Sequence, residues 1–205
     1  MRVLLVGDSI SLDYGKYLRD FIREDIQIFG REGVEEAYQN LDIPIGGNGG
    51  DSNRVLAYIQ ELDREYKLNF EYFVFNCGLH DIKRKLHTEP LQVDPERYVS
   101  NLKQILEIMK RNQVKTIFIN TTPADESRYK DIPEFIRHSE DVLKYNILAE
   151  EVMNRHKVDV IDLFGFTDAL EEKGDELFRD HTHFQPEVIR LQAAYIAGAL
   201  NRMII

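Results

Sequence analysis

Short apolar runs alternate with longer amphipathic segments along the chain, and this alternation restricts the fold more than any other feature of the sequence. The apolar runs cover Arg2–Val6, Ile26–Phe29, Tyr72–Cys77, Val114–Ile119 and Val158–Leu163. Runs of this kind are typical of buried parallel strands, and the segments between them are long enough for helical crossovers. We therefore predict an α/β fold with a parallel sheet and helices on both of its faces.

The segments between the apolar runs carry the start signals and the apolar spacing of helices. Helices are predicted from about Leu12, from Asp51 or Ser52, over 94–112, over 138–156 and from Pro186. No repeat, low-complexity tract or interdomain linker interrupts this pattern. We therefore predict a single domain over residues 1–205.

Charge and cysteine content exclude several classes of protein. The chain has 36 acidic and 26 basic residues and a net charge of −10, which disfavours binding to nucleic acids and anionic membranes. Its one cysteine, Cys77, permits no intramolecular disulfide. No apolar stretch approaches the roughly 20 residues of a membrane span, and the run Val3–Val6 is too short for a signal peptide. We expect a soluble, cytoplasmic protein; removal of a leader before this numbering begins and the oligomeric state stay open.

The chemically suggestive segments all follow predicted strands. Gly7-Asp8-Ser9 follows the first strand, Gly78–Asp81 the third, Thr121-Thr122 the fourth and Asp180–His183 the last. In open parallel sheets, sites form beyond the carboxyl ends of the strands. A loop after the fourth strand, which includes Arg128 and Tyr129, can line the same edge.

Ser9 is the candidate nucleophile. It lies at a turn from a strand into a helix, where its hydroxyl can attack a carbonyl and its backbone N–H can receive the resulting oxyanion. The alternative interpretation is that Ser9 only caps this helix. Asp8 is interpreted as a turn-forming residue that supports the site.

Asp180 and His183 are the candidate partners of the nucleophile. A general base must reach the serine and be oriented by a third group, and two residues three positions apart in a tight turn can form such a pair. The alternative is a loop with a capping aspartate and two ordinary histidines. His181, one residue from Asp180, is less well placed for the required hydrogen bond.

Two further segments can supply hydrogen-bond donors. Gly50 lies in a glycine cluster before a helix, and its N–H is a plausible oxyanion donor. The alternatives are a flexible loop or a phosphate-binding turn, although the Gly-Lys-Ser/Thr of nucleotide-binding loops is absent. His80 can point an N–H into the site or be a structural histidine, and Asp81 can orient its loop.

Taken together, the four blocks Gly7-Asp8-Ser9, Gly50-Asp51-Ser52, Gly78-Leu79-His80-Asp81 and Asp180–His183 resemble the ordered blocks of the SGNH (GDSL-like) hydrolases. The resemblance covers nearly the whole chain. It implies a flavodoxin-like three-layer α/β/α sandwich with a five-stranded parallel sheet of order 2-1-3-4-5. It also implies a Ser9–His183–Asp180 triad, an oxyanion hole that includes the N–H groups of Ser9 and Gly50, and no cofactor.

The third block departs from the family pattern. The family usually has Gly-x-Asn-Asp there, with the asparagine amide as an oxyanion donor, whereas this chain has His80. An imidazole N–H can donate the same hydrogen bond, and activity would then depend on pH through His80 as well as His183. A changed reaction or a loss of activity are the alternatives.

The sequence as a whole predicts a serine esterase that cleaves a small-molecule or carbohydrate ester, with a short acyl group such as acetyl, through an acyl-enzyme. Whether water or a second alcohol accepts the acyl group stays open. One rival is a metal-dependent phosphoesterase, whose ligands would be Asp8, His80, Asp81, His181 and His183. The other is a flavodoxin-like binding module without catalytic activity.

Overall fold

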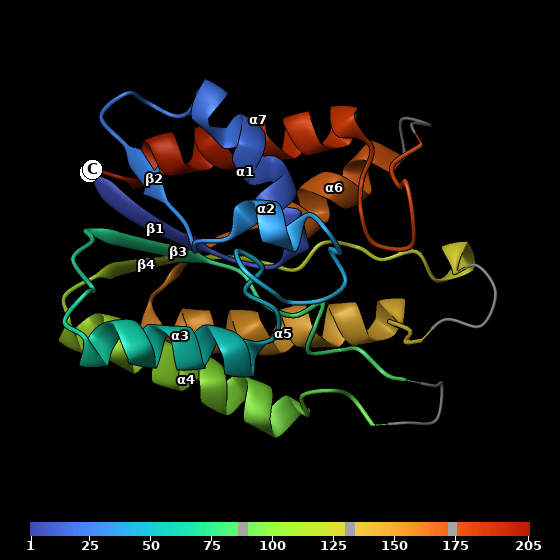
Figure 1. The fold of residues 1–205 in the computed structure, drawn as a ribbon, viewed down its shortest axis with the longest axis horizontal. Coiled ribbons are helices and arrows are strands. Elements are labelled where there is room, and N and C mark those ends of the chain that lie inside the picture. The colour runs from blue at the N-terminus through green and yellow to red at the C-terminus, as the bar shows by residue number, and fades with distance from the viewer. Residues whose placement is uncertain (86–89, 130–133, 172–175) are drawn as a thin grey trace.

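The structure is a computed structural model that describes residues 1–85, 90–129, 134–171 and 176–205 (Figure 1). Five parallel strands form one sheet in the order β2-β1-β3-β4-β5. They are β1 (Arg2–Val6), β2 (Gln27–Phe29), β3 (Tyr72–Phe75), β4 (Lys115–Ile119) and β5 (Asp159–Ile161). The predicted parallel sheet and its strand order are confirmed.

Helices cover both faces of the sheet and give the three-layer sandwich. The helices are α1 (Ser9–Phe21), α2 (Val34–Ala37), α3 (Ser52–Arg64), α4 (Pro95–Arg111), α5 (Ser139–His156), α6 (Leu163–Glu171) and α7 (Pro186–Met203), and a 3-10 turn covers Glu126–Arg128. Figure 1 shows α1, α6 and α7 on one side of the sheet and α3, α4 and α5 on the other. The short α2 was not predicted, because the segment around it has no clear periodicity.

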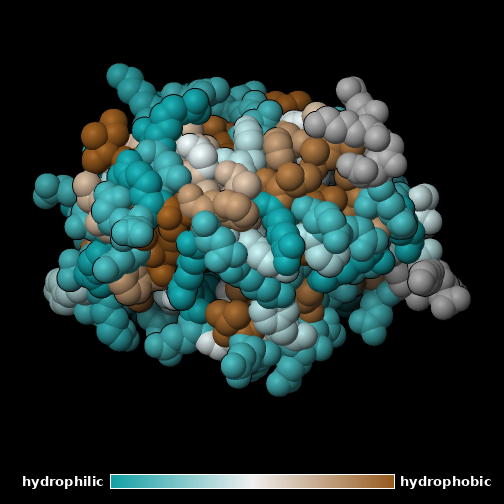
Figure 2. All heavy atoms as spheres, turned by 90° about the horizontal axis from the view of Figure 1, so that it is seen from above, coloured by the Kyte–Doolittle hydropathy of each residue, from teal (hydrophilic) through white to brown (hydrophobic). Residues whose placement is uncertain are grey.

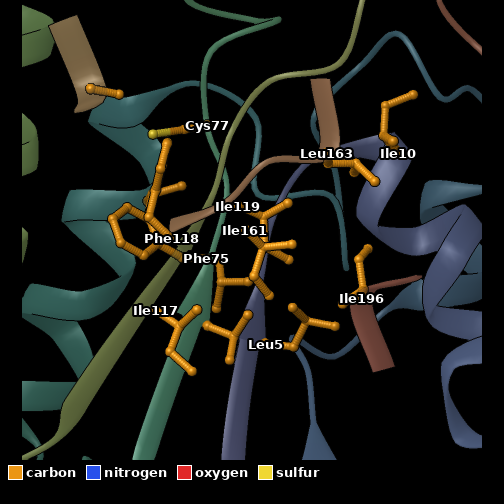
Figure 3. Close-up of a cluster of buried hydrophobic side chains, with 14 of the residues drawn as sticks. Leu5, Ile10, Phe75, Cys77, Ile117, Phe118, Ile119, Ile161, Leu163 and Ile196 are labelled. Atoms are coloured by element: carbon orange, nitrogen blue, oxygen red, sulfur yellow. The ribbon is translucent and has the colours of Figure 1, made fainter. Parts of the chain in front are cut away.

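The middle of the sheet is buried on both faces because β1 and β3 are apolar at every position except Arg2. Phe73 and Phe75 of β3 and Phe118 of β4 are fully buried, and the rings of Phe75 and Phe118 lie 5.0 Å apart. On the side of α1 and α7, Leu5 and Ile196 belong to the same apolar cluster (Figure 3). This core fixes the strand ends from which the site residues project.

Aspartates cap the helices that begin next to the site. The Asp8 side chain accepts a hydrogen bond from the Ile10 N–H at 3.0 Å, and Asp51 accepts one from the Arg54 N–H at the same distance. Each of these bonds satisfies a free N–H of the first helical turn. Ser9 is therefore the first residue of α1 rather than its cap, so its hydroxyl is not used by the helix.

The surface is hydrophilic over most of the face drawn in Figure 2, where apolar side chains form separate groups among polar ones. Leu191 of α7 and Phe21 of α1 are among the exposed apolar side chains. Within the described segments, no helix combines the length and the apolar character needed to cross a membrane.

Candidate active site

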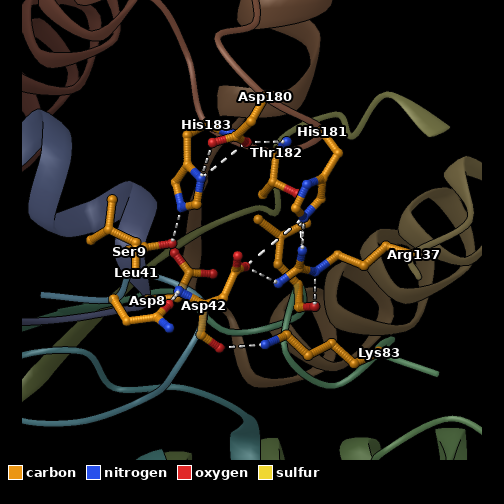
Figure 4. Close-up of polar contacts among 12 residues, drawn as sticks. Asp8, Ser9, Leu41, Asp42, Lys83, Arg137, Asp180, His181, Thr182 and His183 are labelled. Carbon is orange, nitrogen blue, oxygen red and sulfur yellow. Dashed lines mark hydrogen bonds and ion pairs between the residues drawn. The ribbon is translucent and has the colours of Figure 1, made fainter. Parts of the chain in front are cut away.

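Ser9 and His183, which lie far apart in the sequence, meet at the carboxyl edge of the sheet (Figure 4). The Ser9 Oγ lies 2.9 Å from His183 Nε2. Ser9 begins α1, where the backbone N–H groups favour negative charge, and His183 lies just before α7. Both side chains are buried, so the hydrogen bond between them is shielded from water.

Asp180 holds the other side of the His183 ring. Its two carboxylate oxygens lie 2.9 and 3.1 Å from His183 Nδ1. Its Oδ1 also accepts the backbone N–H groups of Thr182 and His183 at 2.9 and 2.8 Å, so the loop itself orients the carboxylate. Burial raises the pKa of Asp180, but hydrogen bonds and the charge of His183 outweigh it and hold the pKa well below its usual range.

This chain of contacts fixes the protonation pattern. Because Asp180 is ionised, it accepts a hydrogen bond from the Nδ1–H of His183. Nε2 of His183 is then free to accept the hydroxyl proton of Ser9. The three side chains thus have the geometry that a serine nucleophile, its base and an orienting group require.

His181 faces away from Ser9. Its Nε2 lies 2.9 Å from Nη1 of Arg137, and its ring stacks on that of Tyr129 with the ring centroids 4.3 Å apart. Arginine can only donate, so His181 accepts at Nε2 and carries its proton on Nδ1. Burial and the charge of Arg137 lower the pKa of His181. In the structure, the two histidines of the Asp180–His183 segment therefore have different hydrogen-bond partners, Arg137 for His181 and Ser9 for His183.

Gly50 has the geometry of a glycine-specific turn. Its φ is +67°, and an added Cβ would come within 2.6 Å of Pro44 Cβ. Its N–H donates to the Oδ1 of Asn48 at 3.0 Å, in the turn that leads into α3. An oxyanion can use this N–H only by sharing it with, or displacing, the Asn48 oxygen.

His80 is a buried imidazole without a hydrogen-bond partner among the described residues. Burial, followed by the charges of Lys83 and Arg137, lowers the pKa of His80 well below its usual value. The ring is therefore neutral and carries one N–H. An unpaired buried donor of this kind costs about 1–3 kcal/mol.

Asp81 and Asp8 hold the loops of the site. Both carboxylate oxygens of Asp81 accept the N–H of Ser52, at 3.0 and 3.1 Å, and so connect the loop after β3 to the start of α3. Burial raises the pKa of Asp81 to about 8. Asp8 is fully buried at the start of α1, and burial raises its pKa as well.

A cleft of about 1200 Å³ opens beside Asp180 and His181. Its walls are rich in charged side chains and include the rings of Tyr129 and Phe135. Its charged lining residues are Asp42, Lys83, Arg84, Lys85, Arg128, Glu134, Glu176, Arg179 and Asp180. Arg128 and Tyr129, which the sequence placed in the loop after β4, do line this cleft.

Three charged residues at the site were not singled out from the sequence. Asp42 and Lys83 line the cleft, and Arg137 lies buried behind it against His181 (Figure 4). Each lies in an irregular segment without a repeating pattern. Only their positions in loops that follow strands gave a signal, and that signal does not separate them from neighbouring charged residues.

The described residues include no group of three or more His, Cys, Asp and Glu side chains arranged to hold a metal ion. Of the ligands in the phosphoesterase hypothesis, His181 directs its Nε2 to Arg137 and His183 directs its Nε2 to Ser9. These two nitrogens face different partners rather than a common point.

The chain resembles known proteins both in sequence family and in structure. The family model described as GDSL-like Lipase/Acylhydrolase matches residues 3–196. A comparison with curated protein sequences gives no match.

Solved structures with the same fold cover the chain almost completely. A lipolytic protein of the G-D-S-L family from Veillonella parvula is 16% identical with a TM-score of 0.69, and covers 98% of this chain and 99% of its own. A lipase/acylhydrolase from Enterococcus faecalis is 19% identical with a TM-score of 0.68, covering 98% and 96%. Est24, a carbohydrate acetylesterase from Sinorhizobium meliloti, is 13% identical with a TM-score of 0.65, covering 99% of each chain. The TM-scores and the coverage establish a shared fold.

Proposed function

Because the chain belongs to the GDSL-like lipase/acylhydrolase family, we propose that it is a serine esterase whose nucleophile is Ser9, with His183 as base and Asp180 as orienting residue. The observation that carries this proposal is the continuous contact from Ser9 Oγ through the His183 ring to the Asp180 carboxylate. The rest of the site has to stabilise an oxyanion and admit an ester.

The reaction follows from these contacts. His183 Nε2 takes the hydroxyl proton while Ser9 Oγ attacks the ester carbonyl. The carbonyl oxygen becomes an oxyanion, and His183 then returns its proton to the leaving alcohol. This leaves an acyl group on Ser9. Water, activated by the same histidine, releases the acid and restores the serine.

The oxyanion is stabilised by the backbone N–H of Ser9, the N–H of Gly50 and the ring N–H of His80. The orphaned imidazole of His80 supports its role, because its missing hydrogen bond is formed only when the oxyanion is present. Gly50 contributes after its N–H is released from Asn48. Asp8 and Asp81 act through the loops that they hold.

The substrate is a small-molecule or carbohydrate ester with a short acyl group. Ser9 itself is only 3% exposed, which favours an acetyl-sized group at the nucleophile. The charged and aromatic cleft beside Asp180 suits a polar alcohol such as a sugar. The shared fold with a carbohydrate acetylesterase is compatible with this choice.

The test is hydrolysis of 4-nitrophenyl acetate by the wild type and by Ser9→Ala, each with and without EDTA. We expect Ser9→Ala to lose at least about 10³-fold in kcat, and EDTA to have no effect. Ser11→Ala is the matched control, since the Ser11 hydroxyl is used within the first turn of α1, where it donates to the Asp8 carbonyl.

Two results would overturn the proposal. Activity that survives Ser9→Ala but disappears with EDTA would support the metal-dependent phosphoesterase. Absence of ester hydrolysis in the wild type, with this substrate and with an acetylated sugar, would support a binding module.

A further inference from the structure

Arg137 is a guanidinium that the fold buries and fixes beside the candidate active site. Its Nε donates to the carbonyl of Leu79 at 2.7 Å, and its Nη1 donates to Thr182 Oγ1 at 3.0 Å and to His181 Nε2 at 2.9 Å. Leu79 precedes His80, and Thr182 precedes His183. The guanidinium is therefore held by two loops that carry proposed site residues, and only its Nη2 is directed elsewhere.

The Nη2 of Arg137 faces Asp42. The distance from Nη2 to Asp42 Oδ1 is 3.6 Å, and the same oxygen lies 3.9 Å from His181 Nε2 (Figure 4). Neither distance is that of a hydrogen bond, and this buried oxygen has no hydrogen-bond partner among the described residues. The Asp42 carboxylate is thus attracted to Arg137 by its charge but forms no hydrogen bond with the guanidinium.

Lys83 brings a second positive charge to the same place. Its Nζ donates to the backbone carbonyl of Asp42 at 2.6 Å and lies 4.1 Å from the centre of the Phe135 ring. The Arg137 guanidinium lies 4.8 Å from the centre of that ring, on which both cations therefore pack. Burial, followed by the nearby charge of Arg137, lowers the pKa of Lys83 to about 7, and an anion at this position would reverse that effect.

These charges lie close enough to the proposed nucleophile to act on its neighbours. The charge of Arg137 lowers the pKa of both Asp8 and His80, and the charge of Lys83 lowers the pKa of His80. In Figure 4 the Asp42 carboxylate lies between the Ser9–His183 pair and Arg137. Asp42 and Lys83 also line the cleft that we assign to the alcohol part of the substrate.

We propose that Arg137 and Lys83 bind a carboxylate on the alcohol part of the ester, at the position where the structure has the Asp42 side chain. The inference rests on the proposed esterase function and deepens it by naming a substrate class, acylated acidic alcohols such as acidic sugars. A guanidinium binds a carboxylate better than it binds a neutral hydroxyl, because two charged groups meet in a shielded site. The Asp42 carboxylate marks where that group sits.

The experiment compares two acetate esters that differ in charge alone, 3-acetoxybenzoate and 3-acetoxybenzamide. Acetate release gives kcat/KM for each, divided by its uncatalysed hydrolysis rate, and the ratio of the two values is the preference for the anion. We expect the wild type to prefer 3-acetoxybenzoate by about tenfold or more, the size of one charge-assisted hydrogen bond.

Three variants locate this preference. Lys83→Gln should reduce it several-fold, whereas Asp42→Asn should increase it, because the competing carboxylate is gone. Lys85→Gln is the matched control: it removes one positive charge from the cleft wall two residues away, and the preference should stay within about twofold if contact rather than general charge decides. None of these variants removes the buried Arg137, whose loss would disturb two loops.

The outcomes separate this inference from the proposed function. Hydrolysis of the neutral ester that depends on Ser9, with no preference for the anion, would overturn the carboxylate site and leave the esterase standing. Equal reductions in Lys83→Gln and Lys85→Gln would also overturn it. If the wild type shows no hydrolysis that depends on Ser9, this result would instead contradict the proposed function.

Discussion

Two histidines separated by a single residue, His181 and His183, differ in chemical state because each faces a different partner. His183 lies between a carboxylate and a hydroxyl, so it can accept a proton at Nε2. His181 accepts from an arginine at the same atom, so that nitrogen is already used. A proton acceptor in the proposed reaction therefore has to be His183, and the difference comes from neighbours rather than from the residue type.

The orienting role of Asp180 can be tested by Asp180→Asn. The asparagine oxygen can still accept the backbone N–H groups of Thr182 and His183, so the loop should keep its shape. The amide cannot stabilise a protonated ring, and it favours the wrong tautomer of His183. We expect kcat for 4-nitrophenyl acetate to fall about 10³–10⁴-fold with an unchanged circular dichroism spectrum. A loss below about tenfold would remove Asp180 from the mechanism.

The donor role of His80 can be tested by comparing His80→Ala with His80→Asn. Removal of one oxyanion donor typically costs about 10²–10³-fold in kcat, which we expect for His80→Ala, while the asparagine amide should retain part of that activity. Because burial keeps His80 neutral, the acid limb of the pH profile of kcat/KM should not move in His80→Asn. Equal and small losses of kcat in both variants would exclude His80 as an oxyanion donor.

The site residues differ in how far the sequence alone could assign them. Ser9, Asp180 and His183 were predicted because they lie in short blocks that follow the first and the last strand along the chain, and the structure brings them together. Their catalytic roles stay predictions. Arg137 and Asp42 were missed because their meaning comes from long-range contacts between irregular loops, which leave no spacing in the sequence.

At the level of helices and strands, prediction succeeded where a local pattern exists. The five strands lie within a residue or two of the apolar runs, and Asp51 and Asp94 cap helices as expected. The segment from Gly30 to Gly50 was not resolved into elements. Next to α2, the backbones of Gly33 and Gly46 are in close contact. A Cβ added at Gly46 would lie only 2.2 Å from the Gly33 carbonyl oxygen. A backbone contact of this kind has no local signal.

The connection between the β3 loop and α3 makes stability depend on pH through Asp81. Its pKa is about 8 in the folded chain against an ordinary value of 3.8, so the folded state binds more protons between these values. The contribution of Asp81 to stability is therefore fully present below about pH 4 and is lost as pH rises towards 8. Ser52 stays hydrogen-bonded to this side chain in either state.

The variant Asp81→Asn removes this dependence, since an amide does not titrate. As the pH rises from 5 to 8, we expect the free energy of unfolding of Asp81→Asn in urea to increase relative to that of the wild type. The increase should be at most about 1.4 kcal/mol per pH unit. Asp20→Asn, on the exposed part of α1, controls for the loss of one negative charge. Parallel pH curves for the wild type and Asp81→Asn would refute the assignment.

For the whole molecule, the order of the strands explains why the site is assembled from distant segments. The first strand lies inside the sheet between β2 and β3, so the strands beside the Ser9 segment both come later in the chain. The Ser9 and His183 segments are 174 residues apart. The helices that carry or follow them, α1 and α7, pack against each other. Packing of α7 against α1 thus supports the meeting of His183 and Ser9.

The contribution of α7 to the stability of the fold can be measured with two variants of the same helix. Ile196 is fully buried against the sheet, whereas Leu191 is 45% exposed, so Ile196→Ala creates a cavity and Leu191→Ala does not. We expect Ile196→Ala to lower the free energy of unfolding in urea by about 2–5 kcal/mol and Leu191→Ala by at most about 0.5 kcal/mol. Since Ile196 lies in the core, kcat of the folded variant should match that of the wild type. Equal destabilisation by both variants would mean that α7 does not hold the sheet through this face.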